Sequence, residues 1–363
     1  MTSAPEADRD ELRMMVRGML DDLSTSAAVR AVAESEARFD PSLWKQVSEV
    51  GWAGIEAPEQ LGGGGASFAD AAVVLTELGR HLATAPLAST MVLGLGALLL
   101  AGTPAQQAAW VPAVCEGRAR GTAALDSDGS SATQEGDSWI VSGTWSYVPD
   151  ADLADFVVLV ARSGAEEVLL LARASDLDIR PTPMLDSTRH FCRLEAKGVR
   201  LDAEAHLSAG GSDAIAALRD RAALGTACDS LGLAERALAM TVDYAKTREQ
   251  FGRQIGSFQA VKHECSNMLI GVETSRVAIN TALAAYDASP TGASLEASMA
   301  KAHTNEAVAA VASSAVVLHG GIGVTWEHDA HLILKRAKLN QVLDGSTRYH
   351  RRRTADRVLG PVA

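Results

Sequence analysis

The spacing of apolar residues changes twice along this chain. From about residue 8 to 117 they recur every three to four positions, as on one face of an amphipathic helix. Between about 120 and 205 they gather into short β-rich runs of strand length, such as 156–161 and 168–172. Helical spacing then returns in three long segments, 213–248, 258–288 and 295–318. The pattern predicts an α+β protein in the order helices, small antiparallel sheet, helical bundle.

Local signals place the boundaries. Asp40 followed by Pro41, and Thr103 followed by Pro104, are typical of a helix start. Glycine and proline at 290–292 and 320–323 separate the long helices. We expect three domains: an N-terminal helical domain over 1–119, a middle β domain over 120–208 and a C-terminal helical bundle over 209–363.

Composition excludes several classes of protein. The net charge is −12, which argues against binding to nucleic acid or to an anionic membrane. Residues 91–102 form the most apolar stretch and are too few to span a bilayer. The acidic N-terminal residues lack the apolar core of a secretory signal. We therefore predict a cytoplasmic protein.

The cysteine and histidine spacings do not predict a metal site. The four cysteines lie far apart and form no CxxC pair, so reduced core residues are expected. They are Cys115, Cys192, Cys228 and Cys265. His328 and His331 have an i, i+3 spacing, but no third ligand pattern accompanies them.

Several short strings occur in a recognisable order along nearly the whole chain. They are GWAGI at 51–55, ELGR at 77–80, REQFG at 248–252, HGGIG at 319–323 and LDGS at 343–346. Each is weak alone, but together, with this spacing, they resemble the acyl-CoA dehydrogenase family. That resemblance implies a four-helix bundle at the C-terminus and FAD-dependent α,β-dehydrogenation of an acyl-CoA thioester. It also implies an FAD that lies across a dimer interface, with the flavin ring on one subunit and the adenine end on its neighbour.

The resemblance assigns cofactor contacts to seven residues. They are Arg248, Phe251, Gln259, Gly320, Gly321, Gly345 and Ser346. A guanidinium can bind a pyrophosphate through two parallel hydrogen bonds. Without the family, Arg248 would be interpreted as a helix-dipole cap and Gly320 as a helix C-cap. One departure is Val317, where the family usually has a glutamine.

The flavin-ring side departs further from the family. Tyr147, Val148 and Pro149 stand where the family has a Trp-Ile-Thr string that contacts the ring. Proline has neither a hydroxyl nor a backbone N–H to donate. One interpretation is local sequence drift, with other residues taking over the contacts to the ring. A more specific interpretation is that this chain does not hold a flavin ring of its own.

Two aspartates are candidates for the catalytic base. Asp344 stands where the family often has its catalytic glutamate, one methylene longer. We hold base and non-base roles for it to be equally expected. Asp220 matches the base position of other family members, just before Arg221, but a solvated carboxylate near the helix start is the favoured interpretation there.

Three functions follow from these observations. The first is the cofactor-sharing, catalytically degenerate half of a heteromeric acyl-CoA dehydrogenase, resembling actinobacterial subunits that act on steroid side-chain CoA esters. The second is a self-sufficient homotetramer with Asp344 as base. The third is a non-enzymatic binding protein with the same scaffold. The expected partners are an acyl-CoA substrate and a second subunit, either a paralogue or another copy.

Overall fold

The computed structural model describes residues 6–36 and 39–360. Its backbone contacts divide into two compact units. Among the described residues, the sheet unit contains 34–36, 39–71 and 84–222, and the bundle unit contains 6–33, 72–83 and 223–360. The proposed division into three consecutive domains stays a prediction.

The helices of the sheet unit begin where the sequence signals predict. Asp40 accepts hydrogen bonds from the backbone N–H groups of Ser42 and Leu43 at the start of α3 (Pro41–Glu49). Thr103 forms a capping box at the start of α7 (Pro104–Cys115). The helical stretch over residues 87–101 is interrupted by a π-helical segment. It consists of α5 (Leu87–Ser89), the π-helix η3 (Thr90–Leu95) and α6 (Gly96–Ala101).

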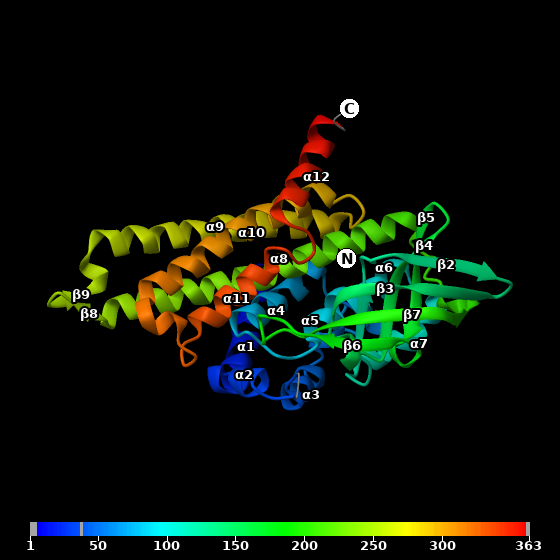
Figure 1. Ribbon diagram of the computed structural model, residues 1–363, viewed down its shortest axis with the longest axis horizontal. Helices are drawn as coiled ribbons and strands as arrows, with labels where there is room; N and C mark the ends of the chain where they lie inside the picture. Colours follow the sequence, from blue (N-terminus) through cyan, green and yellow to red (C-terminus); the bar gives the residue numbers. More distant parts are fainter. Residues whose placement is uncertain (1–5, 37–38, 361–363) are drawn as a thin grey trace. The chain divides into compact units, whose positions relative to one another are not determined.

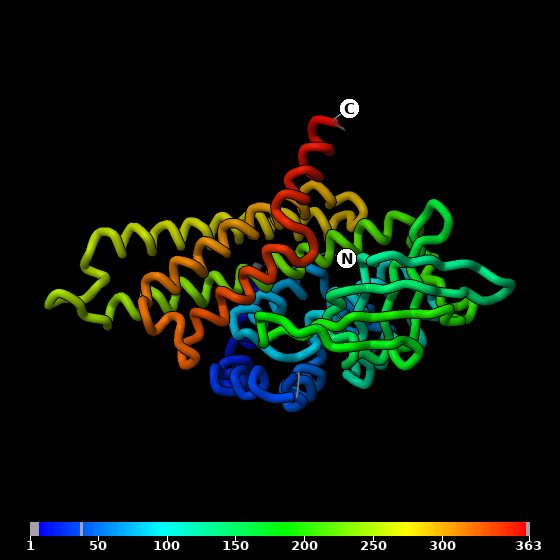
Figure 2. The backbone as a smooth tube through the Cα atoms, in the orientation of Figure 1, coloured from blue at the N-terminus to red at the C-terminus, as the bar shows by residue number. Residues whose placement is uncertain are grey.

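The middle of the chain forms two small sheets, at the right of Figures 1 and 2. One has the order β1-β4-β5 and the other β2-β3-β7-β6. Their bounds are β1 Gly121–Ala124, β2 Ser130–Glu135, β3 Ser138–Pro149, β4 Phe156–Ser163, β5 Glu166–Arg173, β6 Asp178–Thr182 and β7 Phe191–Asp202. The second sheet is antiparallel throughout, while β1 pairs with β4 in parallel. Between them lies a core of alternating inward residues such as Trp145, Leu159 and Leu194.

The bundle unit consists of long helices that lie side by side (Figure 1). They include α8 (Gly211–Thr247), which contributes residues to both units, α9 (Gln259–Ala288), α10 (Ser294–His319) and α11 (Ala330–Asn340). The other helices are α1 (Glu6–Leu23), α2 (Ser26–Ala33), α4 (Phe68–Arg80), whose first four residues belong to the sheet unit, and α12 (Thr347–Leu359). The three longest segments predicted from the sequence are therefore confirmed to within two residues, and so is the α+β fold class.

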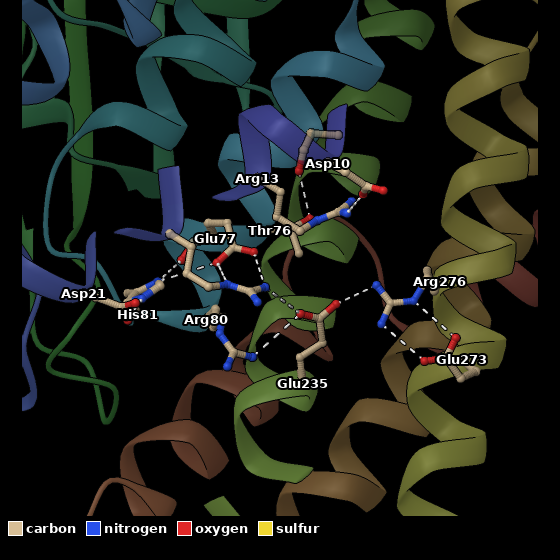
Figure 3. A network of polar contacts seen from close by, with 12 residues as sticks. Asp10, Arg13, Asp21, Thr76, Glu77, Arg80, His81, Glu235, Glu273 and Arg276 are labelled. Carbon is tan, nitrogen blue, oxygen red and sulfur yellow. Dashed lines mark hydrogen bonds and ion pairs between the residues drawn. The ribbon is translucent and has the colours of Figure 1, made fainter. Parts of the chain in front are cut away.

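A network of arginines and carboxylates joins four of these helices (Figure 3). Glu235 on α8 lies at its centre and accepts a hydrogen bond from Arg276 of α9 at 2.7 Å. Its other oxygen lies 3.7 Å from Arg17 of α1 and 3.8 Å from Arg80 of α4. Arg17 in turn donates two hydrogen bonds to the fully buried Glu77. These contacts fix the register of helices that are far apart in the sequence.

By length and composition, one helical segment among the described residues, Ser294–Val324, is apolar enough to cross a membrane. The core helix of a bundle passes the same test, and α10 packs against α9, α11 and α12.

Candidate functional site

A β-hairpin follows α8 at one end of the bundle (Figure 1). Its strands are β8 (Glu249–Gln250) and β9 (Arg253–Gln254), joined by a turn of two residues. Phe251 and Gly252 both have positive φ, 53° and 75°, as a type I′ turn requires. A phenylalanine in this conformation is strained. The residue is 92% exposed, and its ring makes an edge contact with the ring of Phe258, with centroids 6.2 Å apart.

Arg248 lies at the base of this hairpin. Its backbone N–H donates to Tyr244 and its carbonyl accepts from Ile255, which closes the end of the helix. The side chain is exposed and has no partner among the described residues. By contrast, the Arg253 guanidinium lies 4.1 Å from the ring centroid of Phe258. Arg248 is therefore held by its backbone while its guanidinium remains available to a ligand.

The Gly320 turn lies at the same end of the bundle. His319, the last residue of α10, stacks on Tyr244 with ring centroids 4.6 Å apart, so the ends of α8 and α10 are neighbours. Gly320 has a φ of 62° and opens the short helix η8 (Gly320–Val324). An added Cβ at Gly320 or Gly321 would meet nothing within 4 Å.

Gln259 is exposed and begins α9, which is separated from the hairpin by a short 3-10 helix. The structure thus brings five of the seven predicted cofactor residues together. It leaves an exposed apolar surface beside them, consisting of Val317, Ile322, Val324 and Trp326.

The LDGS string lies elsewhere in the bundle unit. Asp344 accepts a hydrogen bond from the Thr226 hydroxyl at 2.5 Å, and Thr226 precedes Arg248 by 22 residues. At a rise of 1.5 Å per residue, that is roughly 33 Å along α8. Gly345 and Ser346 are therefore not gathered with the hairpin. Ser346 is the N-cap of α12 and accepts from the Tyr349 N–H.

Asp344 lies near a buried cluster that sequence reasoning missed. Lys301 of α10 is fully buried, and its ammonium donates to Asn305 at 2.9 Å and to the Asn340 carbonyl at 2.6 Å. Burial lowers the pKa of Lys301 to about 8, while the charges of Asp344 and Asp229 act to raise that pKa. The only sequence signal was a lysine within an Ala-rich apolar helix.

The interpretation of Asp220 as a solvated carboxylate is wrong. Asp220 is fully buried and lies well inside α8. The neighbouring Arg221 is equally enclosed: it forms an ion pair with Glu56, donates to the Val92 carbonyl at 2.9 Å and lies 4.0 Å from the ring centroid of Phe68. Periodicity could not reveal this, because α8 is apolar on most of its circumference.

On the sheet unit, the Tyr147–Pro149 segment is irregular. The register of β3 against β7 shifts between Trp145 and Val148, and Tyr147 has a φ of 58°. Pro149 offers only a carbonyl, which already accepts a hydrogen bond from Thr122 at 2.8 Å. Pro149 therefore cannot donate a hydrogen bond to a flavin ring bound at this segment.

The chain is similar to known proteins over nearly its whole length. A model of the acyl-CoA dehydrogenase N-terminal domain matches residues 6–118, and one of the acyl-CoA dehydrogenase C-terminal domain matches residues 210–359. The chain is 37% identical to the acyl-CoA dehydrogenase IpdE2 of Mycobacterium tuberculosis, over 92% of each chain.

Two solved structures are similar over nearly their full length. The ChsE4-ChsE5 complex from Mycobacterium tuberculosis matches with a TM-score of 0.93 and 30% identity, over 100% of each chain. The Tcur3481-Tcur3483 steroid ACAD variant matches with a TM-score of 0.90 and 31% identity, over 97% of this chain and 98% of that one.

Proposed function

Because this chain belongs to the acyl-CoA dehydrogenase family of CH–CH oxidoreductases, we propose that it is the cofactor-sharing subunit of a heteromeric acyl-CoA dehydrogenase. In this proposal it binds the adenine and pyrophosphate end of an FAD whose flavin ring lies on a partner subunit. The observation that carries the proposal is a difference between two parts of the chain. The residues expected at the adenine end of FAD (the adenine half-site) have suitable groups, whereas those expected at the flavin ring (the ring half-site) do not.

The adenine half-site has the groups that FAD requires. Arg248 offers a guanidinium with no described partner to the two phosphates. The open space at Gly320 and Gly321 lets a ligand approach the backbone closely. The exposed ring of Phe251 provides an apolar surface, and Gln259 offers both a donor and an acceptor.

The ring half-site lacks such groups. Tyr147 occupies a left-handed, half-exposed position, and Pro149 has no N–H to bind the flavin edge. A flavin bound to the complex would supply the acceptor for the hydride that leaves the substrate β-carbon. In this proposal the chain holds the adenine and pyrophosphate end of the cofactor. Its own sheet unit does not have to orient the flavin ring.

The base is then supplied by the partner. A general base must be free to take a proton from the substrate α-carbon. Asp344 instead accepts the Thr226 hydroxyl and lies within the field of the buried Lys301 ammonium. The carboxylate is therefore already engaged by groups of its own chain.

The names of the similar proteins suggest the substrate class. One solved relative is described as a steroid ACAD, and another is a complex of two ChsE chains. We therefore propose the CoA ester of a steroid side chain as substrate, a cytoplasmic location and a heteromeric assembly with a second family member.

Co-expression with that second subunit tests the proposal. We expect the chain alone to purify with little FAD, and the complex to contain half as much flavin as subunits, by absorbance and native mass. A homotetramer of this chain with one FAD per subunit would overturn the proposal and favour the self-sufficient enzyme. A flavin-free complex would favour the binding-protein alternative.

A further inference from the structure

Three side chains of the sheet unit direct ligand-type atoms at one point. The His190 Nε2 lies 2.7 Å from the Asp152 Oδ1, and the Cys192 Sγ lies 3.2 Å from the same oxygen. The Cys192 Sγ and the His190 Nε2 are 3.6 Å apart. Within the described residues, this is the one group of at least three His, Cys, Asp or Glu side chains whose ligand atoms are so close.

The two distances to sulfur are close to those in a metal site, and the His190–Asp152 distance of 2.7 Å is shorter. Ligands around a tetrahedral Zn²⁺ lie roughly 3.3–3.6 Å apart, given bonds of about 2.0 Å to nitrogen and oxygen and 2.3 Å to sulfur. The triangle observed is slightly smaller, so a point roughly 2.1 Å from all three atoms already exists without any side-chain movement. Only a small opening of the His190–Asp152 contact would make the geometry ideal.

The chemistry of the three donors selects zinc. A thiolate, an imidazole and a carboxylate form a mixed set that suits a borderline-soft divalent ion, whereas Mg²⁺ and Ca²⁺ prefer oxygen ligands alone. The two negative charges of the carboxylate and thiolate would balance the ion. The Cys192 side chain is fully buried, while His190 and Asp152 are 14% and 16% exposed. Water can therefore reach the fourth position from the side of these two residues.

The site also has a structural purpose. Cys192 of β7 pairs with Val148 of β3, and the His190 carbonyl accepts from the Asp150 N–H. Tyr147 and Asp150, on either side of Val148, both have the positive φ that non-glycine residues rarely adopt. An ion bound by Asp152, His190 and Cys192 would tie this strained segment to β7.

We propose that Asp152, His190 and Cys192 form a structural Zn²⁺ site that fastens the end of β3 and the turn after it to β7. Binding displaces the Cys192 thiol proton to solvent, so zinc affinity falls as the pH is lowered. The site is independent of the cofactor half-site on the bundle unit.

Metal analysis of the full chain tests this proposal without any flavin readout. The protein is stripped with a chelator, incubated with ZnCl₂, desalted and analysed by mass spectrometry for bound metal. We expect one zinc ion per chain. We also expect CoCl₂ to produce a thiolate-to-cobalt charge-transfer band in the near ultraviolet.

Matched cysteine variants locate the ion. Cys192→Ser keeps the size of the side chain and should lose both the zinc and the cobalt band. Cys265→Ser, which changes a partly exposed cysteine on α9, should keep both. If Cys192→Ser does not fold, Asp152→Asn replaces it, with a weakened affinity expected. A wild-type chain that retains no zinc and gives no cobalt–thiolate band, or a Cys192→Ser variant that retains the wild-type amount of zinc, would overturn the proposal.

Discussion

Asp344 stands where the family resemblance predicts a catalytic carboxylate, but its surroundings are those of a structural residue. Its backbone is left-handed, with a φ of 53°, and its side chain accepts from Thr226. The next residue, Gly345, allows no side chain, because an added Cβ would lie 2.5 Å from the His350 ring nitrogen. The loop is therefore packed around Asp344 in one conformation, which stabilises the fold whether or not the carboxylate takes a proton.

Asp344→Asn should leave the dehydrogenation rate of the complex within a few-fold of wild type. The amide can still accept from Thr226, and only the ionisable group is lost. Removal of a true general base costs about 10²–10⁴-fold. Flavin bleaching with saturating acyl-CoA measures the rate, with Asp220→Asn beside it. A loss of that size in Asp344→Asn alone, at unchanged flavin content, would assign the base to this chain.

Arg248→Ala should weaken FAD retention by the complex about 10–100-fold, because a hydrogen bond to a charged group contributes roughly 1.5–3 kcal/mol. Arg253→Ala is the matched control on the same hairpin, since its guanidinium already contacts Phe258. The measurement is FAD dissociation during dilution. Equal losses in the two variants would mean that the positive charge of the hairpin, and not a specific contact, retains the cofactor.

At the scale of elements, the hairpin between α8 and α9 conflicts with its own sequence. A type I′ turn favours asparagine or glycine at its first central position, and this chain has Phe251 there. Local strain of this kind persists where function uses the side chain. The exposed ring is the property that a cofactor or a partner subunit would bury.

Phe251→Gly should maintain or raise the free energy of unfolding, by up to about 1 kcal/mol, while FAD retention falls. Phe251→Tyr keeps the aromatic ring and the strain, so it should retain FAD as wild type does. Chemical denaturation and flavin content are measured on the same preparations. If Phe251→Gly retained FAD as wild type does, the Phe251 ring would have no role in binding the cofactor.

Helix α10 contains the buried charge of Lys301, and this gives stability a characteristic pH dependence. Its pKa is about 8 in the folded protein against an ordinary value of 10.5. Between these values the unfolded chain binds the proton and the folded chain does not. The contribution of Lys301 to stability therefore rises with pH across this window, by up to roughly 1.4 kcal/mol per unit.

Denaturation curves of wild type and Lys301→Met, below pH 8 and near pH 10.5, measure this effect. The free energy of unfolding of wild type, relative to that of Lys301→Met, should be greater at the higher pH. Only wild type has the group that titrates. A difference that stays constant with pH would show that Lys301 has an ordinary pKa.

At the scale of the whole molecule, charge contacts connect the parts of the bundle unit that the chain order separates. Glu235 is shared by arginines of three other helices, and Arg80 among them has its pKa lowered, mainly by burial (Figure 3). Glu235 itself is only 10% exposed. Its removal would leave three guanidinium groups facing one another.

Glu235→Gln should lower the free energy of unfolding by roughly 2 kcal/mol. The loss is smaller than the 3–5 kcal/mol of a fully buried pair because Arg17 and Arg276 are about one-third exposed. Glu306→Gln, which breaks an exposed pair with Arg351, should change stability by less than about 1 kcal/mol. Denaturant midpoints compare the two, and equal small losses would show that the network adds nothing to stability.

The sequence by itself determined the elements and their order, because helix caps and hydrophobic periods act over a few residues. Asp40 and Thr103 begin helices as expected, and the REQFG and HGGIG strings mark turns that the structure places together. Family strings then sufficed to identify the fold, and they predict the adenine half-site that we propose.

Tertiary structure alone decided what surrounds each side chain. The burial of Asp220 and the enclosure of Lys301 depend on which face of an apolar helix meets its neighbours. The meeting of Asp152, His190 and Cys192 depends on the register of β3 against β7, which pairs Val148 with Cys192 across more than forty residues of chain. Such contacts arise from long-range packing, and residues that are distant in the sequence carry no local signal that they will meet.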